Sequence, residues 1–161
     1  MRTLSRVLAP AALAALLLHA APAGADPVPA DPVPADAAPA DDAVAAATPE
    51  SVCGAGYRII DSLPISTPRL WATVYLLYNS GNGYNCVVTW KKTNLSVRTY
   101  TEARIQVKGS STIHRNGGDF YTYAGPVRVK APGKCVQFGG VASDAPGGQR
   151  FQSLSPWGHC G

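Results

Sequence analysis

The sequence predicts an all-β protein: a small antiparallel sandwich or barrel of about seven strands, stapled by two disulfides, over residues 51–161. Three observations lead to this prediction. Short runs rich in aromatic and β-branched residues alternate with Gly, Pro and Asn turn signals. No stretch shows a sustained helical repeat of apolar residues. Four cysteines, an even number, occur without the CxxC spacing that zinc sites use.

The clearest local prediction is a β-hairpin. Residues 71–78 (WATVYLLY) and 85–90 (NCVVTW) both have strand composition, and residues 79–83 (NSGNG) between them are turn formers. We expect Gly81 and Gly83 to supply the positive φ angles that such a tight loop needs.

The remaining strands are shorter. Residues 104–108 and 127–130 alternate polar and apolar side chains, the pattern of a strand with one wet face and one buried face. Turn signals at 116–118 and 125–126 divide the region. Further strands are expected at 57–60, 120–123 and 135–138.

The cysteines are Cys53, Cys86, Cys135 and Cys160. Three pairings are open from sequence, and we favour Cys53 with Cys86 and Cys135 with Cys160 because each closes a local loop. The Gly-, Ser- and Pro-rich stretch 141–161 would then be pinned to the body of the domain, with Phe151, Leu154 and Trp157 covering an edge or the end of the core.

The N-terminal fifty residues differ in composition from the rest. Two arginines followed by an apolar run too short to span a bilayer comfortably predict a signal peptide, residues 1–25, cut before Asp26. Residues 26–50 repeat Ala, Asp and Pro, hold six acids and no base, and predict an extended disordered tether. A propeptide is the alternative for this segment. The protein is therefore expected to be secreted, without a membrane span.

The domain from residue 51 onward is basic, with twelve Lys or Arg against four acids. Bases expected to face outward, together with aromatic side chains (Tyr75, Tyr78, Trp90, Tyr121 and Tyr123), are typical of surfaces that hold polyanions. The bases predicted to bind a polyanion are Arg104, Lys108, Arg128, Lys130 and Lys134. Because we expect the chain to be exported, we expect it to meet anionic cell-wall or spore-surface polymers rather than nucleic acid. We also expect it to be a monomer. The alternative is that the charge only keeps a small β-protein soluble.

Residues that could support catalysis are few. After signal removal the chain keeps two histidines, His114 and His159, and no serine lies in a GxSxG turn. The four acids fall near turns or strand ends, and no metal-ligand spacing occurs. We therefore expect no catalytic residues, no metal and no cofactor.

From Cys53 onward the chain resembles the spore-associated protein A family. The resemblance is carried by CGAGY (53–57), TVYLLYN (73–79), GYNCVVT (83–89), YAGPV (123–127), GKCV (133–136) and the terminal HCG (159–161). It extends over residues 53–161 and includes all four cysteines, but not the acidic segment. The resemblance implies export and association with a spore or aerial-cell surface, with no established enzymatic activity to carry over.

Taken together, the residues and the resemblance predict a secreted, non-catalytic protein of the cell or spore envelope that binds anionic wall polymers. The alternative is a small secreted protease inhibitor that presents the loop 79–83 or the turn 116–119. A wall-degrading enzyme is the third class.

Overall fold

The computed structural model describes residues 46–161. The expected signal peptide and nearly all of the expected tether lie outside the described residues. The elements in chain order are α1 (Pro49–Cys53), β1 (Arg58–Ser66), β2 (Leu70–Asn79), β3 (Tyr84–Lys91), β4 (Thr99–Val107), β5 (Ile113–Phe120), β6 (Tyr123–Lys130), β7 (Val136–Ser143) and β8 (Arg150–Leu154).

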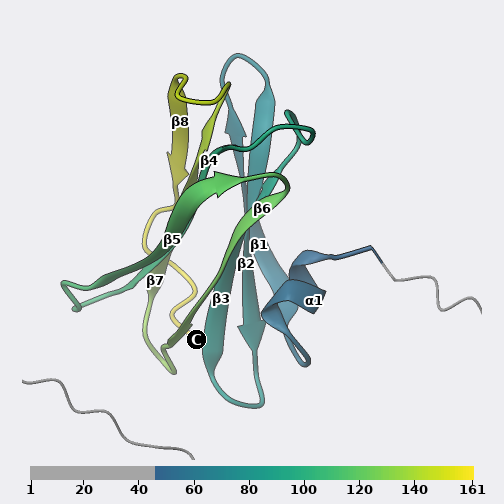
Figure 1. Cartoon of the computed structure of the whole chain (residues 1–161). Helices are drawn as coiled ribbons and strands as arrows, with labels where there is room; N and C mark the ends of the chain where they lie inside the picture. The colour runs from purple at the N-terminus through teal and green to yellow at the C-terminus, as the bar shows by residue number, and fades with distance from the viewer. Residues whose placement is uncertain (1–45) are drawn as a thin grey trace, which may run out of the picture. The chain divides into compact units, whose positions relative to one another are not determined.

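The strands form two antiparallel sheets packed face to face (Figure 1), so the predicted all-β fold is confirmed as a sandwich of eight strands. The first sheet has the order β1-β2-β3-β6 and the second the order β5-β4-β7-β8. Their inner faces contribute Val74, Leu76, Ile105 and Phe138 to one apolar core. Thr89 on β3 crosses this core and donates a 2.8 Å hydrogen bond to the carbonyl of Glu102 on β4.

The short helix α1 covers part of the outer face of the first sheet (Figure 1). Its N-cap is Thr48, whose side chain accepts from the Ser51 amide in a capping box. Cys53 at its end is bonded to Cys86 on β3, and the pair packs with Tyr57, Leu77 and Val88. The helix begins at Pro49, two residues before the expected start of the domain.

Both favoured disulfides are present, Cys53–Cys86 and Cys135–Cys160. The hairpin is also confirmed, as β2 and β3 with Ala72 opposite Lys91 at one end and Asn79 opposite Tyr84 at the other. Its loop needs a positive φ at Gly83 (74°) only. Gly81 instead has its amide held by the Asn79 side chain at 3.0 Å, so the expectation for Gly81 is wrong.

Three local predictions between β4 and β7 are wrong. The segment 116–118, expected to be a turn, lies in the middle of β5, and the expected strand 120–123 spans the turn from β5 to β6. Glycine at 117 lets the Tyr100 side chain lie over the strand, since a Cβ there would be 2.8 Å from the Tyr100 hydroxyl. Gly125 and Pro126 were expected to precede a strand but lie inside β6. Gly125 has a φ of 108° and lies where the pairing of β6 with β3 is irregular. A Cβ at Gly125 would meet the Val87 carbonyl at 2.7 Å.

The C-terminal segment is ordered by a strand that the sequence did not predict. β8 pairs with β7, and Phe151 stacks on Trp71 with ring centroids 5.2 Å apart. Phe151 therefore covers the core as expected. Leu154 and Trp157 do not, because 49% and 40% of their surfaces are exposed.

Candidate functional site

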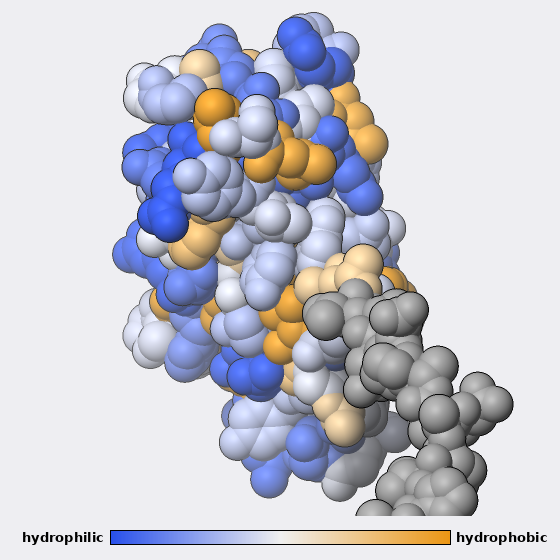
Figure 2. All heavy atoms as spheres, turned by 45° about the vertical axis from the view of Figure 1, so that its right-hand side comes forward, coloured by the Kyte–Doolittle hydropathy of each residue, from blue (hydrophilic) through white to orange (hydrophobic). Residues whose placement is uncertain are grey.

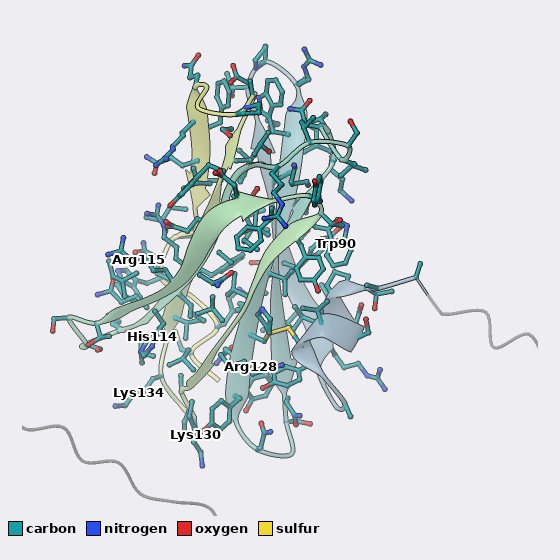
Figure 3. The ribbon with its side chains drawn as sticks, in the orientation of Figure 1. Trp90, His114, Arg115, Arg128, Lys130 and Lys134 are labelled. Carbon is teal, nitrogen blue, oxygen red and sulfur yellow. A yellow bond between two sulfur atoms is a disulfide. The ribbon has the colours of Figure 1, made fainter. Side chains whose placement is uncertain are left out.

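The five bases predicted to bind a polyanion do not lie on one surface. Arg104 is on β4 of the second sheet, whereas Arg128 and Lys130 are on β6 of the first. Lys108 and Lys134 lie in neighbouring loops, since the Lys108 amide donates to the Cys135 carbonyl at 2.9 Å. Figure 3 shows Lys130 and Lys134 at the lower end of the molecule, away from Arg115 on β5.

Arg128 has a structural partner. Its guanidinium donates to the carbonyl of Cys53 at 2.9 and 3.1 Å and to that of Val52 at 3.1 Å. These are carbonyls at the end of α1, which have no partner within the helix. Arg128 thus fixes α1 to β6, next to the Cys53–Cys86 disulfide.

The aromatic residues are also divided. Trp90 and Tyr123 are direct cross-strand partners on the outer face of the first sheet, and their rings stack with centroids 4.8 Å apart. Tyr75 packs against the same outer cluster, whereas Tyr121 lies in the β5–β6 turn beside Arg98. In Figure 2 the exposed hydrophobic groups form separate small areas among hydrophilic ones. That face therefore presents no broad apolar surface.

A recess lined by three arginines lies on the outer face of the second sheet. We call it the arginine hollow, a depression of about 360 Å³. It is lined by Tyr100, Glu102, Arg104, Arg115, Val141, Arg150 and Gln152.

Strand register explains why these residues meet. Alternate residues of β4 point to the same face, so Tyr100, Glu102 and Arg104 face outward while Ala103 and Ile105 enter the core. Arg104 lies directly opposite Arg115 on β5, and Val141 on β7 lies opposite Gln152 on β8. Four strands thus contribute side chains to one recess.

The arginines of this recess lack ionic partners in the described part of the chain. The ion pair found among residues 46–161 joins His159 to Asp61, so no carboxylate lies within 4.0 Å of Arg104, Arg115 or Arg150. Arg104 donates to the Gln152 side chain at 3.3 Å, while its Nε is shielded from solvent without a hydrogen-bond partner. Like charges directly opposite on paired strands are destabilising. An anion placed between Arg104 and Arg115 would relieve that repulsion.

Tyr100 and Glu102 form the floor of the hollow. The Tyr100 hydroxyl donates to Glu102 Oε2 at 2.9 Å, and Glu102 is 7% exposed. This hydrogen bond, together with burial, raises the pKa of Tyr100, against the opposing influence of Arg150 and Arg115. The Arg150 guanidinium lies 3.6 Å from the centre of the Tyr100 ring. The floor therefore holds a fixed acceptor beside three guanidinium donors.

Sequence reasoning named Arg104 in this recess and missed Arg115 and Arg150. Arg115 directly precedes the predicted turn at 116–118, and Arg150 begins β8, a strand that the sequence analysis does not predict. The alternation of residues 99–107 (TYTEARIQV) was the available signal, because it places Tyr100, Glu102 and Arg104 on one face.

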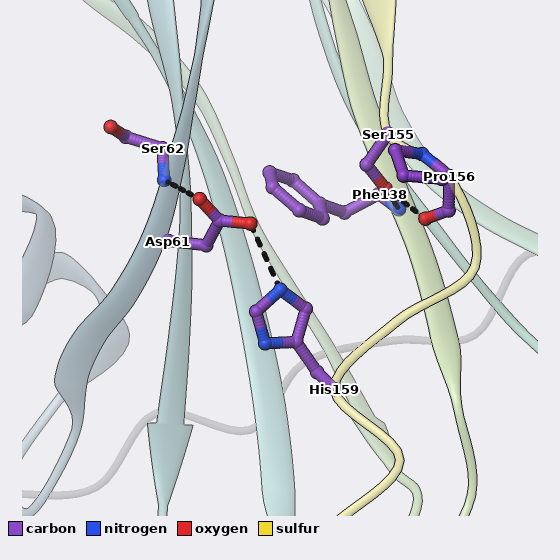
Figure 4. Close-up of polar contacts among 6 residues, drawn as sticks. All are labelled: Asp61, Ser62, Phe138, Ser155, Pro156 and His159. Carbon is purple, nitrogen blue, oxygen red and sulfur yellow. Dashed lines mark hydrogen bonds and ion pairs between the residues drawn. The ribbon is translucent and has the colours of Figure 1, made fainter.

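A second polar group joins the C-terminal segment to β1 (Figure 4). His159 Nε2 lies 2.9 Å from Asp61 Oδ2, and the other Asp61 oxygen accepts from the Ser62 amide at 2.7 Å. The His159 ring meets Phe138 edge-on, with centroids 6.1 Å apart. Among residues 46–161 no hydroxyl or thiol is hydrogen-bonded to His159, so this pair lacks the nucleophile of a hydrolytic triad.

Other site types find little support in the part of the chain that the structure covers. Its histidines, cysteines and acids form no group of three or more that could hold a metal ion. No helix within residues 46–161 has the length and apolar character needed to cross a bilayer.

The fold and the recess define a disulfide-linked β-sandwich protein with an arginine-rich hollow on one sheet. Over 99 residues the chain is 44% identical to spore-associated protein A of Streptomyces coelicolor (strain ATCC BAA-471 / A3(2) / M145). The aligned part covers 62% of this chain and 62% of that relative. The resemblance to the spore-associated protein A family is thereby confirmed. No protein-family model and no solved structure matches the chain.

Proposed function

We propose that this protein is a secreted, non-catalytic component of the cell or spore surface that binds anionic surface polymers through the arginine hollow. The observation that carries the proposal is the pair Arg104 and Arg115, directly opposite on neighbouring strands, with no carboxylate of residues 46–161 within 4.0 Å of either. A planar guanidinium binds carboxylate or phosphate through two parallel hydrogen bonds. Arg150, on the other side of Glu102, supplies a third guanidinium.

The similar protein of Streptomyces coelicolor supports the location. Its name associates it with spores, and a surface-associated role for the present chain is consistent with that name. Secretion is proposed from the N-terminal sequence. A net positive domain is suited to retention on a negatively charged surface without a covalent link.

The proposal is tested by sedimentation with purified cell walls and spores over a range of salt concentrations. The test variant carries Arg104→Gln, Arg115→Gln and Arg150→Gln. Each lost charged contact removes about 1.5–3 kcal/mol, so we expect retention to fall at least a hundredfold. Because screening is strong beyond about 10 Å at moderate salt, binding of the unmodified protein should also weaken as salt is raised.

The matched control carries Lys108→Gln, Lys130→Gln and Lys134→Gln. It loses the same amount of charge from residues outside the hollow, Lys130 and Lys134 at the lower end of the molecule (Figure 3) and Lys108 in the loop next to Cys135. We expect this control to keep most of its binding. Equal losses in the two variants would mean that net charge alone retains the protein, and binding unaffected by either would refute the proposal.

The protease-inhibitor alternative receives no specific support. The loop 79–83 is a tight turn closed by a 2.9 Å bond from the Gly83 amide to the Asn79 carbonyl. The segment 116–119 is paired with β4 along its length.

A further inference from the structure

The arginine hollow adjoins two further recesses along β4, and we call this row of three recesses the groove. A recess of about 170 Å³ adjoins it on one side and shares Tyr100 and Arg150 with it. A smaller recess of about 70 Å³ adjoins it on the other side and shares Arg104. The three recesses follow the outward residues of β4 from Tyr100 to Gln106. At about 3.3 Å per residue, six residue steps correspond to a groove roughly 20 Å long.

The side chains that form the floor of the groove lie against Gly117. A Cβ at this position would approach the Tyr100 hydroxyl to 2.8 Å and Glu102 Oε2 to 3.1 Å. The walls consist of longer side chains, among them Arg104, Arg115 and Arg150. Glycine at 117 therefore leaves room for the Tyr100 and Glu102 side chains, which form the floor between these longer residues.

The chemical character of the groove changes along its length. Asp119 and Ser143 line one end, the three arginines line the middle, and Ile113, Gln137 and Leu154 line the other end. Glu102 and Gln152 place a carboxylate and an amide among the arginines. Such acceptors suit hydroxyl groups, and the Glu102 carboxylate would repel a ligand that carried only closely spaced anions.

We infer that the groove binds an extended acidic polysaccharide whose negative charges are carboxylates, with the chain running parallel to β4. This inference rests on the proposed function and adds the class and the binding mode of the ligand. A carboxylate would lie between Arg104 and Arg115, and ring hydroxyls would face Glu102 and Gln152. Neighbouring sugar units would occupy the recesses at the two ends.

The test measures calorimetric binding of oligogalacturonates of increasing length to the full mature protein. We expect affinity to rise by about tenfold or more from the monomer to the longer oligomers, and to stop rising once the groove is full. Oligomers of glycerol phosphate form the second arm. They carry charge without sugar rings, and we expect them to bind more weakly than oligogalacturonates of equal charge.

The variant Asp119→Asn probes the end of the groove. Asp119 is exposed and its side chain makes no hydrogen bond among residues 46–161, so its replacement should not disturb folding. Removing its charge should raise the affinity for long oligogalacturonates about threefold and leave the monomer unchanged. Glu50→Gln, the same charge change on α1 against the other sheet, should alter neither.

The outcomes separate the two proposals. Equal affinity for monomer and long oligomer would overturn the extended-chain inference while leaving an anion site at the arginines. Tighter binding of glycerol phosphate oligomers would overturn the assignment to a carboxylated polysaccharide. Failure of every anion to bind, with intact retention on walls and spores, would overturn the groove as the binding site.

Discussion

Lys91 offers the sharpest test of how this sandwich is held together. It lies on β3 with 3% of its surface exposed, beneath the loop that leads to β4. Its ammonium donates to the carbonyls of Asn94, Val97 and Phe120 at 2.9, 3.0 and 2.9 Å. One cation therefore joins the β3–β4 loop to the end of β5.

Replacing Lys91 by Met keeps the apolar stem and removes the three hydrogen bonds. An unpaired buried carbonyl costs about 1–3 kcal/mol. We take the lower figure because the replacement also removes the cost of burying a charge, which gives a loss of about 3 kcal/mol in the free energy of unfolding. With a urea m-value of about 1.5 kcal/mol/M, the unfolding midpoint should fall by about 2 M.

The matched control is Lys92→Met, next in sequence and exposed. We expect it to change stability by less than about 0.5 kcal/mol. If the two variants unfold within about 0.5 kcal/mol of each other, the three bonds at Lys91 do not stabilise the fold and the reasoning is wrong.

Titration supplies a second check on Lys91. Burial lowers the pKa of Lys91 from its ordinary value of 10.5. Between the folded and unfolded pKa values the unfolded chain binds more protons at this site, so the Lys91 contribution to stability rises with pH in that window. The difference in stability between the unmodified protein and Lys91→Met should therefore widen as the pH rises toward 10.5. A narrowing difference would contradict burial as the cause.

Three further predictions concern the Cys53–Cys86 disulfide, the core and the arginine hollow. Replacing Cys53 and Cys86 together by Ser opens a loop of 33 residues and should lower the free energy of unfolding, measured by chemical denaturation, by about 3.5 kcal/mol. A loss below about 1 kcal/mol would show that Arg128 alone holds α1. Gly140→Ala would place a methyl group against Thr89 Oγ1 and the Glu102 carbonyl, and it should lower the melting temperature by several degrees. The control Gly158→Ala has open space around the added methyl group and should leave the melting temperature unchanged. Equal effects of the two changes would count against the close approach of the two sheets at Gly140. Glu102→Gln should lower the pKa of Tyr100 toward 10.0. The pKa is measured by ultraviolet titration, with Tyr100→Phe as the reference that lacks this phenol. An unchanged pKa of Tyr100 would show that Glu102 does not hold the phenol proton.

Structural features that depend on residues close together in the sequence were predicted correctly. The β2–β3 hairpin follows from a turn-forming loop between two runs of strand composition, both visible within twenty residues. The disulfides follow from the number of cysteines and the preference for local loops. Predictions failed where a residue type has two uses. In the sequence, Gly117 predicts a turn, but within β5 it leaves room for the side chains of Tyr100 and Glu102 on the neighbouring strand.

The sequence by itself determined the fold class, the basic charge of the domain and the resemblance to spore-associated protein A, and it favoured one of three possible disulfide pairings. These depend on composition and on neighbours along the chain. Only the tertiary structure decided that Arg104, Arg115 and Arg150 line one hollow while Lys130 and Lys134 lie elsewhere. Which side chains meet across a sheet depends on strand order and register, and those are set by packing between segments far apart in sequence.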